Sequence, residues 1–163
     1  MTSQSKSLFE TIYRDHRSMV YQMCMGFMKG DSEMASDLSQ EIFINVWNAL
    51  SRFKGESSYK TWIYRITVNT CLQQIRKTKN KQNISLSDSF EVAEPINNMQ
   101  ETHLQLYKAI GQLAEVDRLI IIMVLEEAEY DEIAKVMGIN ETNLRVKIHR
   151  IKKRLKELLA YAG

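Results

Sequence analysis

The C-terminal part of the chain carries an apolar pattern with a helical period. Between residues 142 and 159, apolar side chains recur at steps of four and three, which places them on one face of an α-helix. These residues are Leu144, Ile148, Ile151, Leu155 and Leu158. From Arg145 to Lys156 the chain holds seven Lys or Arg and no Asp or Glu. The pattern predicts a helix with one side against a core and a basic side outside.

A shorter helix and a glycine turn precede this basic helix. The stripe over 130–137 predicts the shorter helix, and Gly138 favours a stop because left-handed backbone suits glycine. Asn140 or Thr142 can then cap the next helix. Further upstream, the unbroken apolar run from Leu119 to Leu125 predicts a fully buried helix. Together these elements predict a helix-turn-helix, whose second helix enters the major groove of DNA.

The basic helix carries two kinds of candidate DNA contact. An Arg can donate two hydrogen bonds to guanine, and Val146 can touch a thymine methyl. Side chains on the outer face suited to base edges are Arg145, Val146, His149 and Arg150. Lysines better suited to phosphates are Lys147, Lys152, Lys153 and Lys156. The alternative for such a face is an ordinary solvated surface.

The N-terminal half predicts two amphipathic helices. The first runs over about 7–28 and is ended by Gly30 and Asp31; the second runs over about 32–50. The outer side of the second helix combines acids, amides and one apolar residue: Asp37, Gln40, Glu41, Ile44 and Asn48. An apolar anchor ringed by acceptors indicates a protein-docking face. Single exposed apolar residues are also common, so a plain surface remains the alternative.

The segment after Arg52 predicts a central helix beside a polar, aromatic loop. Gly55 breaks the chain, and Ser57 or Ser58 can cap the helix. Apolar residues cover much of its circumference, which indicates burial from more than one side. Cations and amides alternate with aromatic rings, as a single-strand nucleic-acid binder requires: Lys54, Tyr59, Lys60, Tyr64, Arg65 and Asn69. Trp62 and the tyrosines can equally be core.

Composition separates these helices into two groups. Residues 78–101 are polar, lack periodicity and contain the one proline, Pro95, which is typical of a flexible linker. Helical periodicity resumes at His103. Since no alternating strand pattern is present, we expect an all-α chain of two small helical domains.

The distribution of charge and of reactive residues narrows the range of possible functions. The net charge is only +2, but an acidic run at 126–132 lies just before the basic helix, which suggests separate surfaces for separate partners. Cys24 and Cys71 fall among apolar residues and are expected to be buried free thiols. The scattered histidines have no metal-ligand spacing, so we expect no metal, no cofactor and no enzyme. A polar start and the lack of long apolar runs predict a cytoplasmic protein without membrane insertion.

The motifs DLSQEIFINVW (37–47) and RFKGESSYKTWIYRITVNT (52–70), followed by a linker and a helix-turn-helix, resemble the bacterial extracytoplasmic-function sigma factors. The resemblance covers nearly the whole chain. It implies region 2 at 1–78, a linker at 79–102 and region 4 at 103–163. It further implies core RNA polymerase and promoter DNA as partners, together with an anti-sigma factor, and no catalytic residue.

The resemblance also implies site residues. The residues implied to dock on polymerase are Asp37, Gln40, Glu41, Ile44 and Asn48. Those implied to open and hold the −10 element are Lys54, Ser57, Ser58, Tyr59, Lys60, Trp62, Arg65 and Asn69. Those implied to read the −35 element are Asn143, Arg145, Val146, Lys147, His149, Arg150 and Lys153.

The chain departs from the family pattern at a few positions. Leu113-Ala114 stands where Leu-Pro is frequent, and Val146 stands where a serine often follows the first recognition arginine. Two other functions fit parts of the sequence. A stand-alone helix-turn-helix regulator accounts for the C-terminal half but leaves the 54–69 segment unexplained. A helical adaptor would bind proteins only.

Overall fold

The computed structural model describes residues 3–82 and 101–162, and within them every regular element is helical. The helices of the N-terminal unit are α1 (Ser3–Phe27), α2 (Ser32–Ala49), the short 3-10 helix η1 (Leu50–Arg52) and α3 (Tyr59–Gln82). Those of the C-terminal unit are α4 (Glu101–Gly111), α5 (Glu115–Leu125), α6 (Tyr130–Met137) and α7 (Glu141–Ala162). The all-α prediction is confirmed.

Local capping explains where the N-terminal helices begin. Gly30 adopts a left-handed φ of +85°, and the Asp31 side chain then accepts a hydrogen bond from the Met34 backbone N–H at 3.1 Å. The hydroxyl of Ser58 accepts from the Thr61 N–H at 3.1 Å, so Ser58 rather than Ser57 caps α3. Apolar faces of α1, α2 and α3 then bury one another.

The helix-turn-helix forms as predicted. Gly138 ends α6 with φ 70° and ψ 32°, and the Asn140 carboxamide oxygen caps α7 by accepting from the Asn143 N–H at 2.7 Å. Asn140, not Thr142, is therefore the cap. The stripe of α7 is buried except for half-buried Leu158, so its basic side faces outwards.

Two features differ from the sequence-based expectations. The α3 helix continues to Gln82, into the stretch expected to be linker, because a helix makes its backbone hydrogen bonds within itself and need not end where apolar periodicity ends. At the other end, α4 begins at Glu101, so Glu101 and Thr102 are helical rather than linker. Residues 83–100, Pro95 included, lie outside the described residues. Leu125 was expected to be buried but is 50% exposed, since it ends α5 where the chain turns towards α6.

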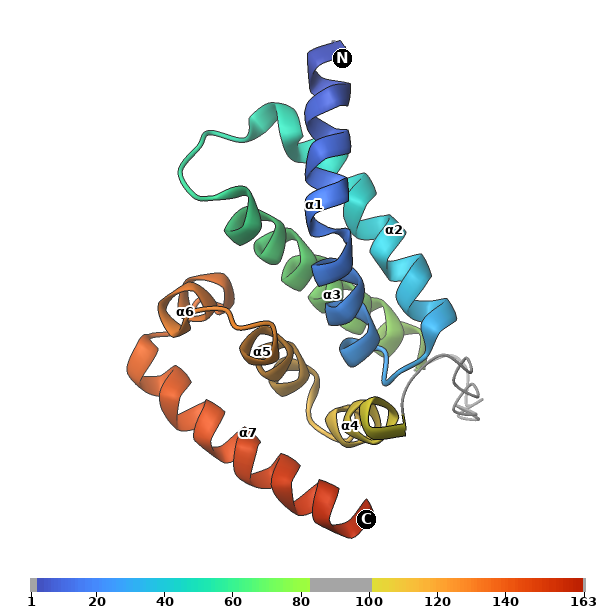
Figure 1. The fold of residues 1–163 in the computed structure, drawn as a ribbon, viewed down its shortest axis with the longest axis vertical. Coiled ribbons are helices and arrows are strands. Elements are labelled where there is room, and N and C mark those ends of the chain that lie inside the picture. Colours follow the sequence, from blue (N-terminus) through green and yellow to red (C-terminus); the bar gives the residue numbers. More distant parts are fainter. Residues whose placement is uncertain (1–2, 83–100, 163) are drawn as a thin grey trace.

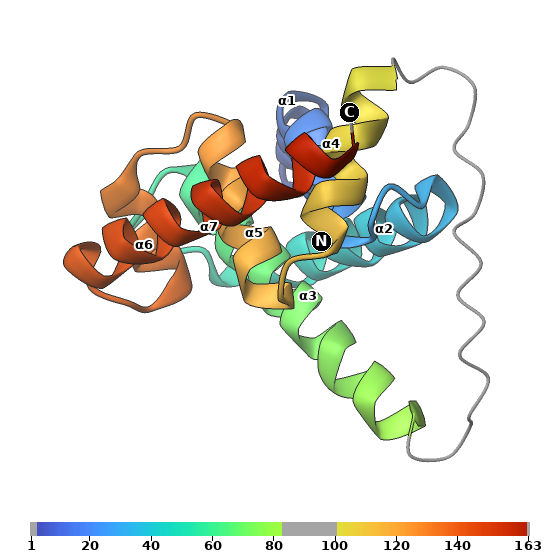
Figure 2. The same cartoon turned by 90° about the horizontal axis from the view of Figure 1, so that it is seen from below.

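The two units pack against each other. Figure 1 shows α5 between α1 and α7, with α6 beside α3, while Figure 2 shows the end of α3 projecting from the other helices. Buried residues of both units form one continuous cluster. No helix among the described residues has the length and apolarity that a membrane crossing needs.

Close contacts hold the two units together at the joint between α1 and α5. Gly26 of α1 lies directly against Ile122 of α5, whose side chain fills the space that a Cβ would take. Arg118, which is 8% exposed, donates to the carbonyls of Gly111 and Leu113 at 3.2 and 3.3 Å. Its guanidinium carbon lies 5.3 Å from the ring centroid of Phe27, across the joint. Burial lowers the pKa of Arg118.

Candidate protein and nucleic-acid interfaces

The outer face of α2 is open to solvent. Ile44 is 60% exposed, the highest value among the large exposed apolar side chains of the described residues. Asp37, Gln40 and Asn48 are exposed beside it, and Glu41 is half-buried. The exposure predicted for Ile44 is confirmed, while its role in docking stays a prediction.

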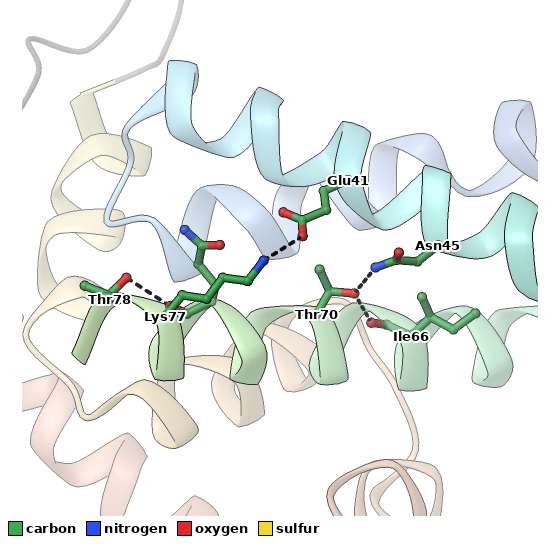
Figure 3. A network of polar contacts seen from close by, with 7 residues as sticks. Glu41, Asn45, Ile66, Thr70, Lys77 and Thr78 are labelled. Carbon is green, nitrogen blue, oxygen red and sulfur yellow. Dashed lines mark hydrogen bonds and ion pairs between the residues drawn. The ribbon is translucent and has the colours of Figure 1, made fainter. Parts of the chain in front are cut away.

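Polar contacts tie this face to α3. Asn45 donates to the Thr70 hydroxyl at 3.0 Å, and that hydroxyl donates to the Ile66 carbonyl at 2.7 Å (Figure 3). Elsewhere along the same pair of helices, Lys77 of α3 lies 3.8 Å from a carboxylate oxygen of Glu41. A protein bound on α2 would therefore be held at a fixed position relative to α3.

Aromatic rings gather where the loop enters α3. The ring centroid of Phe53 lies 4.7 Å from that of Tyr59 and 4.9 Å from that of Trp62. Tyr59 and Trp62 are half-buried against the core. Trp62 is therefore partly a core residue, as the alternative reading of the sequence held, and the rest of its side chain is exposed to solvent.

Tyr64 does not belong to this open aromatic group. The sequence placed it among rings available for stacking, but it is fully buried because its helix face turns to the C-terminal unit. Its hydroxyl has no hydrogen-bond partner among the described residues, and burial raises its pKa. Tyr64 is a core residue.

The polar candidates of this segment are mostly open to solvent. Ser57 is half-buried, and the others are exposed: Lys54, Ser58, Lys60, Arg65 and Asn69. Lys54, Ser57 and Ser58 lie on the loop that leads to Tyr59, whereas Lys60, Arg65 and Asn69 lie on α3 itself, as Trp62 does. This combination can hold a single strand through phosphates and stacked bases.

The C-terminal unit contacts the start of α3. The hydroxyl of Thr61 donates to a carboxylate oxygen of Glu132, in α6, at 2.8 Å. Thr61 is only 9% exposed. The sequence did not predict this contact, because the two residues lie 71 positions apart in the chain. The acidic run that contains Glu132 was the one feature that could have indicated a contact there.

The basic face of α7 is accessible along the helix. Asn143, Arg145, Val146, His149, Arg150 and Lys153 are exposed, Val146 by 48%. Lys147 differs, since it is half-buried and lies 3.3 Å from a carboxylate oxygen of Asp117 in α5. Lys147 is therefore less free to reach a phosphate than the lysines beyond it.

Arg145 is held by two neighbours. It lies 2.8 Å from a carboxylate oxygen of Glu141, one turn back on α7. Its guanidinium carbon lies 5.0 Å from the ring centroid of Tyr130, the first residue of α6. The two helices of the helix-turn-helix thus meet at this side chain.

Neither cysteine of the chain is an activated thiol. Cys24 and Cys71 are buried free thiols, as expected. Burial raises the pKa of Cys24 to about 12 and also raises that of Cys71, so neither is an activated nucleophile. No group of three or more His, Cys, Asp or Glu in the described part of the chain could hold a metal ion.

Comparison with known proteins agrees with this geometry. Residues 12–81 match the family model for sigma-70 region 2, and residues 103–155 match the model for sigma-70 region 4. The chain is 30% identical over 129 residues to the ECF RNA polymerase sigma-E factor of Escherichia coli, covering 70% of this chain and 68% of that protein. It is 25% identical over 156 residues to the sigma factor SigV of Bacillus subtilis, covering 93% and 91%.

A solved structure shares the fold. It is the sigma factor RpoE in complex with the anti-sigma factor NepR from Bartonella quintana, with a TM-score of 0.78 and 21% identity over 98% of both chains. Both family regions, the relatives and the helix-turn-helix geometry converge. The chain belongs to the ECF RNA polymerase sigma factors, which are not enzymes themselves but bind core RNA polymerase and promoter elements to initiate transcription.

Proposed function

We propose that three surfaces divide the work of promoter recognition. The outer face of α2, from Asp37 to Asn48, docks on core polymerase. The loop and helix from Lys54 to Asn69 open the −10 element, and the basic face of α7, from Asn143 to Lys153, reads the −35 element. The domain limits follow the same division: region 2 at 1–78, the linker at 79–102 and region 4 at 103–163.

The observation that carries this proposal is the separation of the three surfaces. Each lies on a different helix, and each keeps its candidate side chains largely exposed while the opposite faces share one core. A sigma factor needs such an arrangement because it holds polymerase and two DNA elements at the same time. Tethering raises the effective concentration of each element at its surface.

The chemistry required is binding alone. Unstacking a base costs a few kcal/mol, and phosphate contacts together with stacking on Tyr59 or Trp62 would offset that cost. Flexible pyrimidine–purine steps lower the deformation energy further. The protein would act in the cytoplasm, where polymerase and promoters are found.

The packing of the two units suggests a closed free state. With α6 against the start of α3, the proposed −10 and −35 surfaces belong to one compact body. We propose that this contact opens when polymerase and promoter bind. The solved relative carries an anti-sigma factor in its complex, and a partner of that kind would keep this chain inactive by holding the closed form.

Reconstituted transcription tests the assignment. The chain and purified core polymerase are incubated with genomic DNA, and start sites are mapped. Arg150→Ala should weaken use of the −35 element by about 1–3 kcal/mol while polymerase binding is retained. Arg154→Ala is the matched control, because Arg154 is an exposed arginine of the same helix that lies outside the proposed −35 surface. Unchanged transcription by the Arg150 variant would remove that residue from the −35 surface.

Two rival functions give other results. A stand-alone helix-turn-helix regulator would protect duplex DNA without polymerase, whereas a helical adaptor would not bind promoter DNA even with polymerase present. A footprint that appears only with polymerase excludes both.

A further inference from the structure

The side chain of Arg145 is fixed from two directions in the absence of DNA. Glu141 accepts a hydrogen bond from its Nη2 at 2.8 Å, and the ring of Tyr130 lies 5.0 Å from its guanidinium carbon. Glu141 lies one turn before Arg145 on α7, whereas Tyr130 lies on α6. The arrangement therefore depends on the packing of two helices and not only on the i, i+4 spacing within α7. Arg145 itself remains exposed.

The two partners are themselves anchored. Tyr130 begins α6 and is half-buried against the core. Glu141 is the first residue of α7, directly after the Asn140 cap. The left-handed turn at Gly138 sets the angle between the two helices. The ring and the helix start that carries the Glu141 carboxylate are therefore held at fixed positions beside Arg145.

This arrangement leaves donors free for a base. A guanidinium has five N–H donors, and Glu141 takes a hydrogen bond from one nitrogen. The Tyr130 ring lies against the guanidinium as a cation–π partner, and it is not an oxygen or nitrogen acceptor for the N–H donors. The remaining donors can make the paired contact with guanine that arginines use in the major groove.

We propose that Tyr130 and Glu141 are positioning residues that set the base preference read by Arg145 at the −35 element. The inference rests on the proposed role of α7. A free arginine loses rotamer freedom when it binds, and holding it beforehand removes part of that cost. The Glu141 carboxylate also disfavours a DNA phosphate as a competing partner for Arg145, because it repels a second anion beside it.

The test measures base preference in transcription by the complete polymerase complex. Promoters varied at each −35 position compete in one reaction, and the position read by Arg145 is the one whose preference disappears in Arg145→Ala. Tyr130→Leu should lower that preference about two- to fivefold. Tyr130→Phe keeps the ring and should retain the preference. Glu141→Ala should lower it, and Glu157→Gln, at another α7 ion pair, should not.

A double variant separates positioning from stability. In the Arg145→Ala background, Tyr130→Leu should cause no further change in base preference, because the residue through which it acts is gone. A loss spread evenly over all −35 positions, or one that persists without Arg145, would overturn the inference. So would full preference in both Tyr130→Leu and Glu141→Ala.

A different set of results would show that the proposed function of α7 is itself wrong. If Arg145→Ala itself left every −35 preference intact, Arg145 would not read the element, and both the assignment and the positioning role would be wrong. If Arg145→Ala removed one preference while the partner variants kept it, only the positioning role would be wrong.

Discussion

Ile122 of α5 occupies the space beside Gly26 of α1, so that a Cβ added at Gly26 would lie 2.3 Å from Ile122 Cδ1 and 2.6 Å from Cγ1. No side chain larger than hydrogen fits there unless Ile122 moves. Because Gly26 belongs to the N-terminal unit and Ile122 to the C-terminal unit, this contact exists only when the two units pack against each other.

Gly26→Ala should therefore weaken the packing between the two units. The added methyl group displaces Ile122, which is 4% exposed, and overpacking of this kind typically costs about 1–3 kcal/mol. Small-angle scattering should show a larger radius of gyration. Ile122→Ala in the same chain makes room and should restore part of the closure. Ser36→Ala, at an exposed position on α2, is the control. Equal radii for all variants would contradict the prediction.

Loss of the Thr61–Glu132 hydrogen bond should make the proposed −10 surface easier to reach. In Glu132→Ala the 2.8 Å contact is absent, and hydrogen bonds to charged groups contribute about 1.5–3 kcal/mol. The free protein should then bind a fluorescent single-stranded −10 oligonucleotide more tightly. Glu129→Ala removes an exposed charge nearby and should have a smaller effect. Equal gains in the two variants would mean that net charge, not the contact, is responsible.

Ile44→Glu should abolish binding to core polymerase. A charge replaces the apolar anchor of the α2 face, and truncating an anchor of an interface often costs about 2 kcal/mol or more. Because Ile44 is 60% exposed, the fold and thermal stability should be unaffected. Co-purification with core enzyme is the measurement. Val116→Glu, at another exposed apolar residue, should co-purify normally; recovery of both variants would exclude Ile44 from the interface.

Two threonines of α3 allow a matched test of the contact between α2 and α3. Thr70→Val removes the acceptor for Asn45 and should lower the free energy of unfolding by about 0.5–1.5 kcal/mol. Thr67 donates only within its own helix, to Ile63, so Thr67→Val should cost less. Urea unfolding measures both. The reverse order would show that the Asn45 contact contributes little.

Stability should decrease at alkaline pH. Burial raises the pKa of the Cys24 thiol from 9.0 to about 12, and it also raises the pKa of Cys71, Tyr64 and Tyr107. The unfolded chain therefore loses these protons first. The stability due to Cys24 is complete below about pH 9 and falls by up to about 1.4 kcal/mol per pH unit as the pH rises towards 12.

Urea unfolding between about pH 8 and 11 measures this decline, because that range spans the unfolded-state pKa of the thiol. Cys24→Ala should show a shallower dependence on pH than the natural chain, even though it starts from a lower stability at the neutral end of the range. Identical slopes would mean that the Cys24 thiol does not take part.

Local features were predictable because they depend on neighbours in the chain. The apolar stripe of α7 and the stop at Gly138 follow from helix periodicity and from unpaired backbone groups at helix ends, and Asn140 was one of two candidates for the cap. The exposure of Ile44 follows from the same periodicity. The motifs on these helices were enough to indicate the family.

Contacts between distant segments were not predictable in this way. Nothing around Gly26 indicates that Ile122 packs on it, and the buried Arg118 looks like any arginine near a helix start. The full burial of Tyr64 depends on where the C-terminal unit lies, and the exposure of Leu125 depends on where α5 ends and the chain turns towards α6.

The sequence by itself determined the helices, the candidates for their caps and which helix faces point outwards, because helix periodicity and capping act over a few residues. Only the tertiary structure decided that the two units share a core, that Glu132 meets Thr61, and that Tyr130 supports Arg145. Such contacts depend on the shape and charge of surfaces that come together after the helices have formed.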